Sequence, residues 1–142
     1  MKEVLDMYNL TNYKVIHLRF GDKFLNENEY NEQIYKLYYN EIRNLKNDKY
    51  ILLSDSSIIA NKLKKEINEL TDSIDSIELY YWDNNKIHLG DLKNKNAENT
   101  NSNILDTMVD FFIMSNSSEI IANGSGFSKI SSIIYNIPYV KI

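Results

Sequence analysis

The sequence predicts an α/β protein in which a doubly wound parallel sheet of about five strands carries helices on both faces. Two observations support this prediction. Five short apolar runs, each the length of a buried strand, recur along the 142 residues. Segments with the three-and-four spacing of amphipathic helices stand between them, and such alternation is typical of parallel sheets. We expect a single domain spanning residues 1–142, because this length is enough for one core and short for two.

The first strand is expected at Tyr13–Leu18, where the residues are mainly β-branched and apolar. A short helix at Lys2–Leu10 is expected before it, and a loop at Phe20–Asn28 after it. Glu29–Asn47 then has the spacing of an amphipathic helix, and we expect its tyrosines to face the core. The positions expected on its apolar side are Tyr30, Ile34, Leu37, Tyr38, Ile42 and Leu45.

The second strand, Lys49–Ser54, ends in the sequence Ser54-Asp55-Ser56-Ser57, ahead of a helix at Ile58–Leu70. These residues are good helix N-caps. They also follow a strand, where an aspartate and free helix amides could meet a nucleotide. The two interpretations are compatible. A third strand is expected at Ser76–Trp82, followed by a polar loop at 83–103, of a length that usually indicates a functional or mobile segment.

The last part of the chain supplies two further strands and two helices. Helix Ile104–Asn116 is expected to turn its apolar residues to the core, and a short strand at Glu119–Ala122 follows. A glycine- and serine-rich turn then opens a helix at Lys129–Asn136. Pro138–Ile142 is the fifth strand, with proline at its start, where a missing N–H costs least. The core-facing positions expected in the first of these helices are Leu105, Met108, Val109, Phe112 and Ile113.

Composition argues against several classes of function. The net charge of −4 argues against general binding to nucleic acid or anionic membranes, which need a basic surface. With no cysteine, disulfides and thiol chemistry are excluded, and two isolated histidines predict no metal site. No apolar run approaches the roughly 18 residues that span a bilayer, and we expect no signal peptide. We expect a compartment without N-glycosylation, such as the cytoplasm, because a glycan at Asn123 would block the turn described below.

The first candidate site lies where the first strand ends. His17 and Arg19 are two apart, so on a strand both side chains point to the same face. Gly21 lets the backbone turn sharply or approach a ligand, and Asp22 can brace an arginine. Ligands of open α/β sheets bind at the carboxyl ends of the strands. The alternative is that Arg19, one of two arginines with Arg43, is a surface salt-bridge partner.

The second candidate site is the turn between the fourth strand and its helix, Gly124-Ser125-Gly126-Phe127-Ser128. Glycines permit close approach of the backbone, serine hydroxyls add donors, and the helix N-terminus carries partial positive charge. This combination suits a diphosphate, although ordinary turns use the same residues. It is neither a dinucleotide-binding fingerprint nor a Walker motif.

Taken together, these segments resemble the fucosyltransferase superfamily, which includes α-1,2-, α-1,6- and protein O-fucosyltransferases. The order and approximate spacing of the blocks are similar to those of the family, over most of the chain from Tyr13 onward. The matching blocks are His-x-Arg-x-Gly-Asp at 17–22, Ser-Asp at 54–55, Asp-Phe-Phe-Ile-Met-Ser at 110–115 and Ile-Ile-Ala-Asn-Gly-Ser-Gly-Phe-Ser at 120–128.

The resemblance implies a role for each matching residue. Arg19 would grip the β-phosphate of GDP-fucose, and His17 would lie against the nucleotide. Asp110 would face the guanine or its ribose, and Asp55 would contact the nucleotide or support a residue that does. The turn residues implied in contact with the diphosphate and the base are Ser125, Gly126, Phe127 and Ser128.

The resemblance also implies an architecture and a reaction. The family uses the GT-B fold, two Rossmann-like lobes that transfer the sugar with inversion and without an obligatory metal or cofactor. The chain resembles the carboxyl-terminal lobe, which binds the GDP-sugar donor. A glycan or a protein would be the acceptor, and Arg19 the catalytic cation. Asp22 is the nearest candidate for the base that deprotonates the acceptor, although a structural role beside Arg19 is the favoured interpretation.

Two departures from the family pattern bear on this hypothesis. Phe20 stands where the α-1,2 and α-1,6 families usually have a second arginine, which weakens assignment to either. In addition, 142 residues leave no room for an acceptor lobe. The chain is then a partial protein, or the acceptor half comes from another chain, and association with such a lobe or with a second copy is expected. The competing hypothesis is a nucleotide- or sugar-nucleotide-binding module without catalysis.

Overall fold

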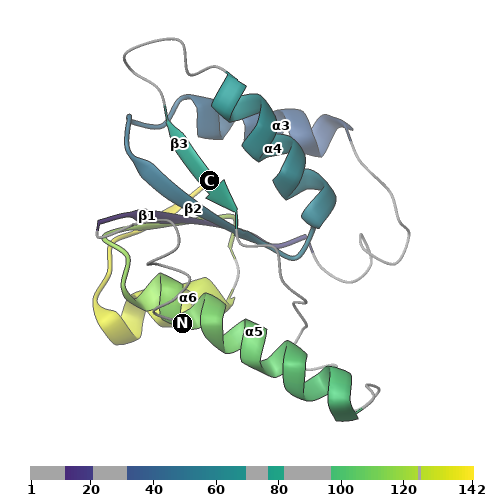
Figure 1. The fold of residues 1–142 in the computed structure, drawn as a ribbon. Helices are drawn as coiled ribbons and strands as arrows, with labels where there is room; N and C mark the ends of the chain where they lie inside the picture. Colours follow the sequence, from purple (N-terminus) through teal and green to yellow (C-terminus); the bar gives the residue numbers. More distant parts are fainter. Residues whose placement is uncertain (1–11, 21–31, 70–76, 82–96, 125) are drawn as a thin grey trace.

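Strands and helices alternate along the residues that the computed structural model describes, which are 12–20, 32–69, 77–81, 97–124 and 126–142, with 97–104 and 106 as backbone only (Figure 1). The elements in these residues are, in order, β1 Lys14–Leu18, α3 Glu32–Arg43, β2 Lys49–Ser54, α4 Ser57–Glu69, β3 Glu78–Tyr81, α5 Ala97–Ser115, β4 Ile120–Ala122, α6 Gly126–Tyr135 and β5 Tyr139–Lys141. The helix expected at Lys2–Leu10 lies outside the described residues.

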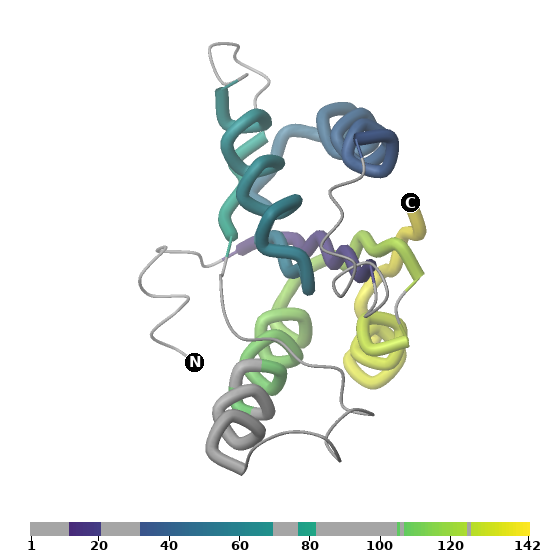
Figure 2. The backbone as a smooth tube through the Cα atoms, turned by 90° about the vertical axis from the view of Figure 1, so that its right-hand side faces the viewer, coloured from purple at the N-terminus to yellow at the C-terminus, as the bar shows by residue number. Residues whose placement is uncertain are grey.

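The strands form one sheet of five parallel strands in the order β3-β2-β1-β4-β5, which confirms the predicted Rossmann-like α/β fold. Helices α3 and α4 cover one face of the sheet, and α5 and α6 cover the other (Figure 1, Figure 2). The chain moves outward from β1 through β2 to β3, then returns to place β4 on the other side of β1. The strand order therefore reverses between β1 and β4, and ligands of open α/β sheets bind at such a point.

Side chains of each strand alternate between two apolar layers. Ile16 and Leu18 pack in the α3/α4 layer, whereas Val15 packs in the α5/α6 layer. Both faces of the sheet are thus buried, as continuous apolar strand sequences predict. The six residues predicted to be buried are all at most 1% exposed: Val15, Ile16, Leu52, Leu53, Ile120 and Ile121.

Helix α5 differs most from the sequence prediction. It begins at Ala97 instead of Ile104, so part of the predicted loop at 83–103 is helical. Its first turns extend beyond the sheet (Figure 1). A part of a helix that does not cover a core needs no apolar face. The asparagine-rich sequence of this segment therefore contains no apolar residues at helical spacing.

The buried face of α5 is also not the predicted one. Leu105 and Met108 were expected to face the core, but they are 61% and 60% exposed. Val109 and Ile113 are buried as expected, and they share the interior with Thr107, Asp110 and Met114. Apolar residues occur on more than one side of this helix, so periodicity alone could not decide which side packs. The fold instead accepts two polar side chains in the interior.

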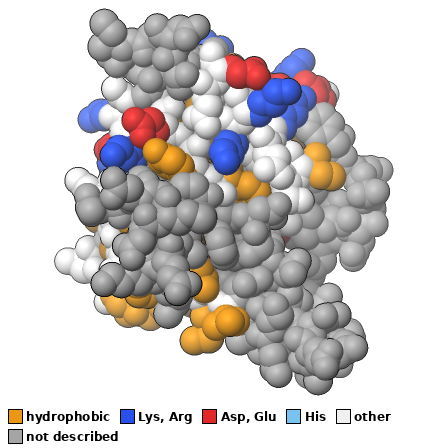
Figure 3. Space-filling model, viewed as in Figure 1, with side chains coloured by type: hydrophobic (Ala, Val, Ile, Leu, Met, Phe, Trp, Pro, Cys, Tyr) orange, Lys and Arg blue, Asp and Glu red, His pale blue; other side chains and the backbone are white. Residues whose placement is uncertain are grey.

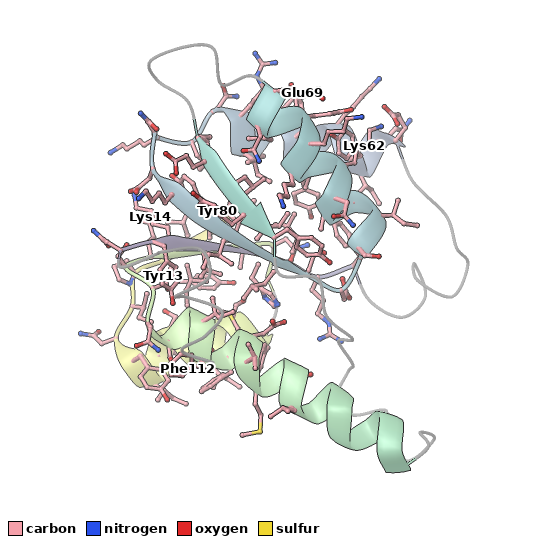
Figure 4. All side chains as sticks on the ribbon, viewed as in Figure 1. Tyr13, Lys14, Lys62, Glu69, Tyr80 and Phe112 are labelled. Carbon is pink, nitrogen blue, oxygen red and sulfur yellow. The ribbon has the colours of Figure 1, made fainter. Side chains whose placement is uncertain are left out.

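The same ambiguity affects α3. Leu37 was expected on the apolar side and is 55% exposed, whereas Tyr35 is buried and takes the central position beside Ile42. Lys62 of α4 (Figure 4) lies over the Tyr35 ring, 4.4 Å from its centroid. The Tyr35 hydroxyl hydrogen-bonds to Glu66. Tyr35, an amphipathic residue with a polar partner at its hydroxyl, therefore occupies the place between α3 and α4 that was expected for Leu37.

Large apolar side chains remain at the surface of the α5/α6 layer. Ile130, Ile133 and Ile134 of α6 are each more than half exposed. In the space-filling view, the charged side chains lie in the upper part of the face, whereas hydrophobic side chains are visible both there and at the lower part, where α5 and α6 run (Figure 3). The described helices include none with both the length and the apolar character needed to cross a bilayer.

Two buried tyrosines donate hydrogen bonds to backbone carbonyl oxygens. The Tyr13 hydroxyl donates a hydrogen bond of 2.7 Å to the carbonyl oxygen of Ile113, so it fastens α5 beneath β1 (Figure 4). The Tyr50 hydroxyl donates one of 2.8 Å to the carbonyl oxygen of Lys46. Burial raises the pKa of Tyr13 from 10.0 to about 12. Burial, with a smaller effect of the Asp48 and Glu119 carboxylates, raises the pKa of Tyr50 to about 12.

These pKa shifts predict a loss of stability at alkaline pH. Below pH 10 the folded and unfolded states both keep the phenolic protons, and the tyrosines contribute in full. From pH 10 to about 12 the unfolded chain loses these protons first, so the free energy of unfolding falls. Urea denaturation of Tyr13→Phe should therefore show a shallower decline over this range than the wild type. Tyr135→Phe, at an exposed position, is the control, and equal slopes for Tyr13→Phe and the wild type would contradict the assignment.

Candidate functional site

The candidate site lies at the edge of the sheet where all the strands end, because a parallel sheet places every carboxyl end at the same edge. Arg19, Asp55, Asn123 and Ile142 directly follow β1, β2, β4 and β5. This edge therefore brings together three of the segments singled out in the sequence. The predicted site residues Gly21, Asp22 and Ser125 lie outside the described residues.

Asn123 fixes the end of β1 to the end of β4. Its side-chain Oδ1 accepts a hydrogen bond of 2.9 Å from the Arg19 N–H, and its Nδ2 donates one of 2.8 Å to the Arg19 carbonyl oxygen. The same Nδ2 lies 3.2 Å from the Tyr38 hydroxyl of α3. A side-chain amide thus makes the paired bonds that a neighbouring strand would make, and β1 and β4 stay joined beyond their last ladder residues.

Arg19 is held by its backbone, while its side chain is half-buried. Within the described part of the chain its guanidinium forms no ion pair. Arg43 has a different setting: it is exposed at the end of α3, with its guanidinium 5.8 Å from the centroid of the Tyr39 ring.

Asp55 links the end of β2 to the end of β1. Its Oδ1 accepts a hydrogen bond of 2.9 Å from the N–H of Phe20, and the Phe20 ring packs edge-on against Tyr38. Next to it, Ser56 caps α4: its carbonyl accepts from the N–H of Ala60 at 3.0 Å, and its Oγ from that of Ile59 at 3.4 Å. The capping interpretation of this segment is confirmed, and Asp55 supports the residue that follows Arg19.

His17 lies within β1, two residues before Arg19, and its side chain faces α6. It is 7% exposed, pairs in register with Ala122 of β4, and its ring meets the Phe127 ring edge-on at 6.1 Å. Phe127 also packs against Phe111 of α5, with 5.5 Å between ring centroids. His17 therefore belongs to a group of aromatic side chains that pack between the sheet and the first turn of α6.

The turn between β4 and α6 has the backbone that its glycines predict. Gly124 has a φ of 104°, which favours glycine because an L side chain is strained there. Gly124 and Gly126 are exposed, and α6 begins at Gly126, so the free amides of its first turn lie at the sheet edge. Ser128 is fully buried, so its hydroxyl is not accessible to a ligand at the surface of the turn.

Buried polar groups are concentrated in the α5/α6 layer. Asp110 of α5 is 4% exposed, and its neighbour Phe111 contacts Phe127, so this part of α5 passes beside the start of α6. The buried polar residues assigned to this layer are His17, Thr107, Asp110, Ser117, Ser128 and Ser131.

Two residues of this edge were not singled out as site residues from the sequence. Asn123 stood in a matching block, and an asparagine directly after a strand is a common turn residue, but only the fold shows that it binds Arg19. Lys141 lies on β5 with its side chain beside Gly124: a Cβ built on Gly124 would be 3.4 Å from its Cε and 3.8 Å from its Nζ. No sequence signal marks it, because its position depends on strand register.

No protein-family model matches the chain, and no curated protein matches it either. Among the described residues, no group of three or more His, Cys, Asp or Glu side chains is placed to hold a metal ion. The fold and the candidate site thus define a Rossmann-like α/β protein with Arg19 and Asn123 joined at the β1/β4 switch point.

The amide pair of Asn123 is expected to stabilise the whole domain. In Asn123→Asp the oxygen that replaces Nδ2 faces the Arg19 carbonyl oxygen, so a hydrogen bond becomes a repulsion. We expect the free energy of unfolding to fall by about 1–3 kcal/mol, the cost of leaving a partly buried group unsatisfied. Urea denaturation measures this change. Asn61→Asp, exposed on α4, adds the same charge as a control, and an equal loss in both variants would refute the role of Asn123.

Proposed function

We propose that the β1/β4 edge binds the diphosphate of a nucleotide sugar, and that the domain is the donor-binding lobe of a fucosyltransferase-like glycosyltransferase. In this proposal a GDP-sugar, with fucose as the expected sugar, is the donor, and a glycan or a protein is the acceptor. The observation that supports it most is the placement of Arg19: it directly follows β1 at the switch point, and the Asn123 side chain holds both its N–H and its carbonyl oxygen.

The electrostatics of the edge suit a phosphate ligand. The chain as a whole carries a net charge of −4, so it attracts no anion by its overall charge. At this edge, however, Arg19 follows β1, the Lys141 ammonium lies beside Gly124, and α6 begins at Gly126 with its first amides free. The Asp55 carboxylate at the same edge accepts a hydrogen bond from the Phe20 N–H. Arginine presents a planar fork that fits phosphate oxygens in pairs. A local cationic site on an acidic protein favours a specific anionic ligand over general polyanion binding.

The same groups suit transfer of a sugar. When the bond between the sugar C1 and the β-phosphate oxygen breaks, that oxygen takes the electron pair and its negative charge grows. A preorganised Arg19 and the amides of α6 stabilise this charge more in the transition state than in the ground state. The acceptor hydroxyl oxygen forms the new bond to C1 and gives up its proton to a base. Asp22 remains the candidate for that base in the proposal.

A binding module without catalysis is the second candidate function. The described elements form one sheet, so an acceptor site has to come from residues outside them or from a second chain. The two candidates share the donor site and differ in turnover. Release of free sugar from GDP-fucose, or its transfer to an acceptor, would favour the enzyme, and stable binding without either would favour the module.

The proposal predicts that Arg19 supplies the affinity for the diphosphate. Arg19→Ala should weaken GDP binding by about 2–3 kcal/mol, the range for a charge-assisted hydrogen bond, with the fold intact because the Asn123 bonds use its backbone. Arg19→Lys should also be damaging, because an ammonium cannot reproduce the planar fork. Titration calorimetry with GDP, GDP-fucose and UDP measures these affinities.

Arg43→Ala is the matched control, because Arg43 is exposed on α3, and its affinity should equal that of the wild type. Equal binding by the wild type and Arg19→Ala would end the donor-site model. A preference for UDP over GDP would leave the phosphate site standing and end the fucosyltransferase assignment.

A further prediction is that nucleotide binding needs no divalent metal. A guanidinium and helix amides can neutralise a diphosphate without one, and no Asp-x-Asp pair, the usual holder of a sugar-nucleotide metal, follows a strand in this sequence. GDP affinity measured with excess chelator should match that measured with Mg²⁺ or Mn²⁺. Strict dependence on either metal would count against the family assignment.

A further inference from the structure

Three residues on adjacent strands lie in one row across the carboxyl end of the sheet. His17 of β1 pairs in register with Ala122 of β4, and Ala122 pairs in register with Lys141 of β5. Residues paired in a parallel sheet point to the same face. His17 contacts α6, and Ala122 and Tyr139 pack in the α5/α6 layer, so Lys141, two residues after Tyr139, points to that layer as well.

The Lys141 side chain continues from this row over the turn that starts α6. Its Cε and Nζ are the nearest atoms to the open side of Gly124, whose φ of 104° and lack of a side chain leave room for the lysine stem. Within the described residues Lys141 makes no ion pair with a carboxylate. An exposed ammonium group beside Gly124, in the turn that leads into a helix N-terminus, is a suitable partner for an anion.

Arg19 and Lys141 flank this turn from opposite sides. β4 lies between β1 and β5 in the sheet, and strands are spaced by about 4.8 Å, so the two backbones are on the order of 10 Å apart. Both side chains are long enough to reach the middle of that gap, above the β4–α6 turn. Two cations on either side of the turn can each engage one of two neighbouring phosphate groups.

We propose that Lys141 is a second phosphate-binding residue, which makes the site selective for nucleoside diphosphates and their sugar esters over nucleoside monophosphates. This inference rests on the proposed nucleotide-sugar function and adds its recognition of the diphosphate. Arg19 binds one phosphate, Lys141 binds the other, and the first amides of α6 lie between them. A monophosphate engages only one of the two cations.

Binding of GDP, GMP and inorganic pyrophosphate to the wild type and to Lys141→Met tests this inference. Methionine keeps the length and packing of the stem over Gly124 and removes the charge. We expect Lys141→Met to weaken GDP and pyrophosphate binding about tenfold, as for loss of one charge-assisted contact, and to change GMP binding much less. Lys65→Met, at an exposed lysine of α4, removes the same charge elsewhere and should bind all three ligands like the wild type.

The outcomes separate this inference from the proposed function. Unchanged GDP and pyrophosphate affinity in Lys141→Met, or equal losses for GDP and GMP, would overturn the role of Lys141 while leaving nucleotide binding intact. Wild-type protein that binds pyrophosphate but no nucleotide would overturn the proposed function, and the Lys141 comparison would still decide the phosphate site. Wild-type protein that binds none of the three ligands would overturn both.

Discussion

The amide group of Asn123 is the contact on which the candidate site depends most. A sheet whose order reverses between β1 and β4 has two strands that diverge where their chains leave for opposite faces. Here one side chain bonds to both the N–H and the carbonyl of Arg19 and so holds the two exits together. Asp55 does the same for β2 through the N–H of Phe20. Residues from three strands therefore keep fixed relative positions although no strand pairing continues at that level.

This arrangement allows positively charged side chains at the site without a large loss of folding free energy. Side-chain amide and carboxylate groups satisfy the backbone at the edge, so the guanidinium of Arg19 and the ammonium of Lys141 need not act as structural partners. Both cations stay at least partly in water, and the large desolvation penalty of buried charge is avoided. The two apolar layers beneath supply the stability: the α3/α4 layer is mainly apolar, whereas the α5/α6 layer holds most of the buried polar groups.

Much of the fold follows from local sequence, because buried parallel strands must be apolar on both faces and five such runs stand out. Val15 and Leu52 could be assigned to the core on that basis, and the serine-rich segment before α4 to a cap. Contacts that depend on strand register could not be assigned. Lys141 meets Gly124 only because β5 pairs with β4 at Ala122, and Asn123 meets Arg19 only because β4 lies beside β1. Helix faces with apolar residues on several sides, as at Leu105 of α5, were also undecidable without the packing partner.

Asn123, which joins β1 to β4, is also the residue of the site that is most open to spontaneous chemical change. Asparagine is among the thermolabile side chains, and a following glycine, as in Asn123-Gly124, leaves the next backbone nitrogen free to attack the side-chain carbonyl and expel ammonia. In the folded protein both polar atoms of Asn123 are held by Arg19, which restricts the rotation that this attack needs. Loss of ammonia leaves a cyclic imide, which water opens to a carboxylate; the side chain then has no N–H to donate to the Arg19 carbonyl, and a negative charge stands beside Arg19. Deamidation at this one residue would thus record how long a molecule has spent unfolded.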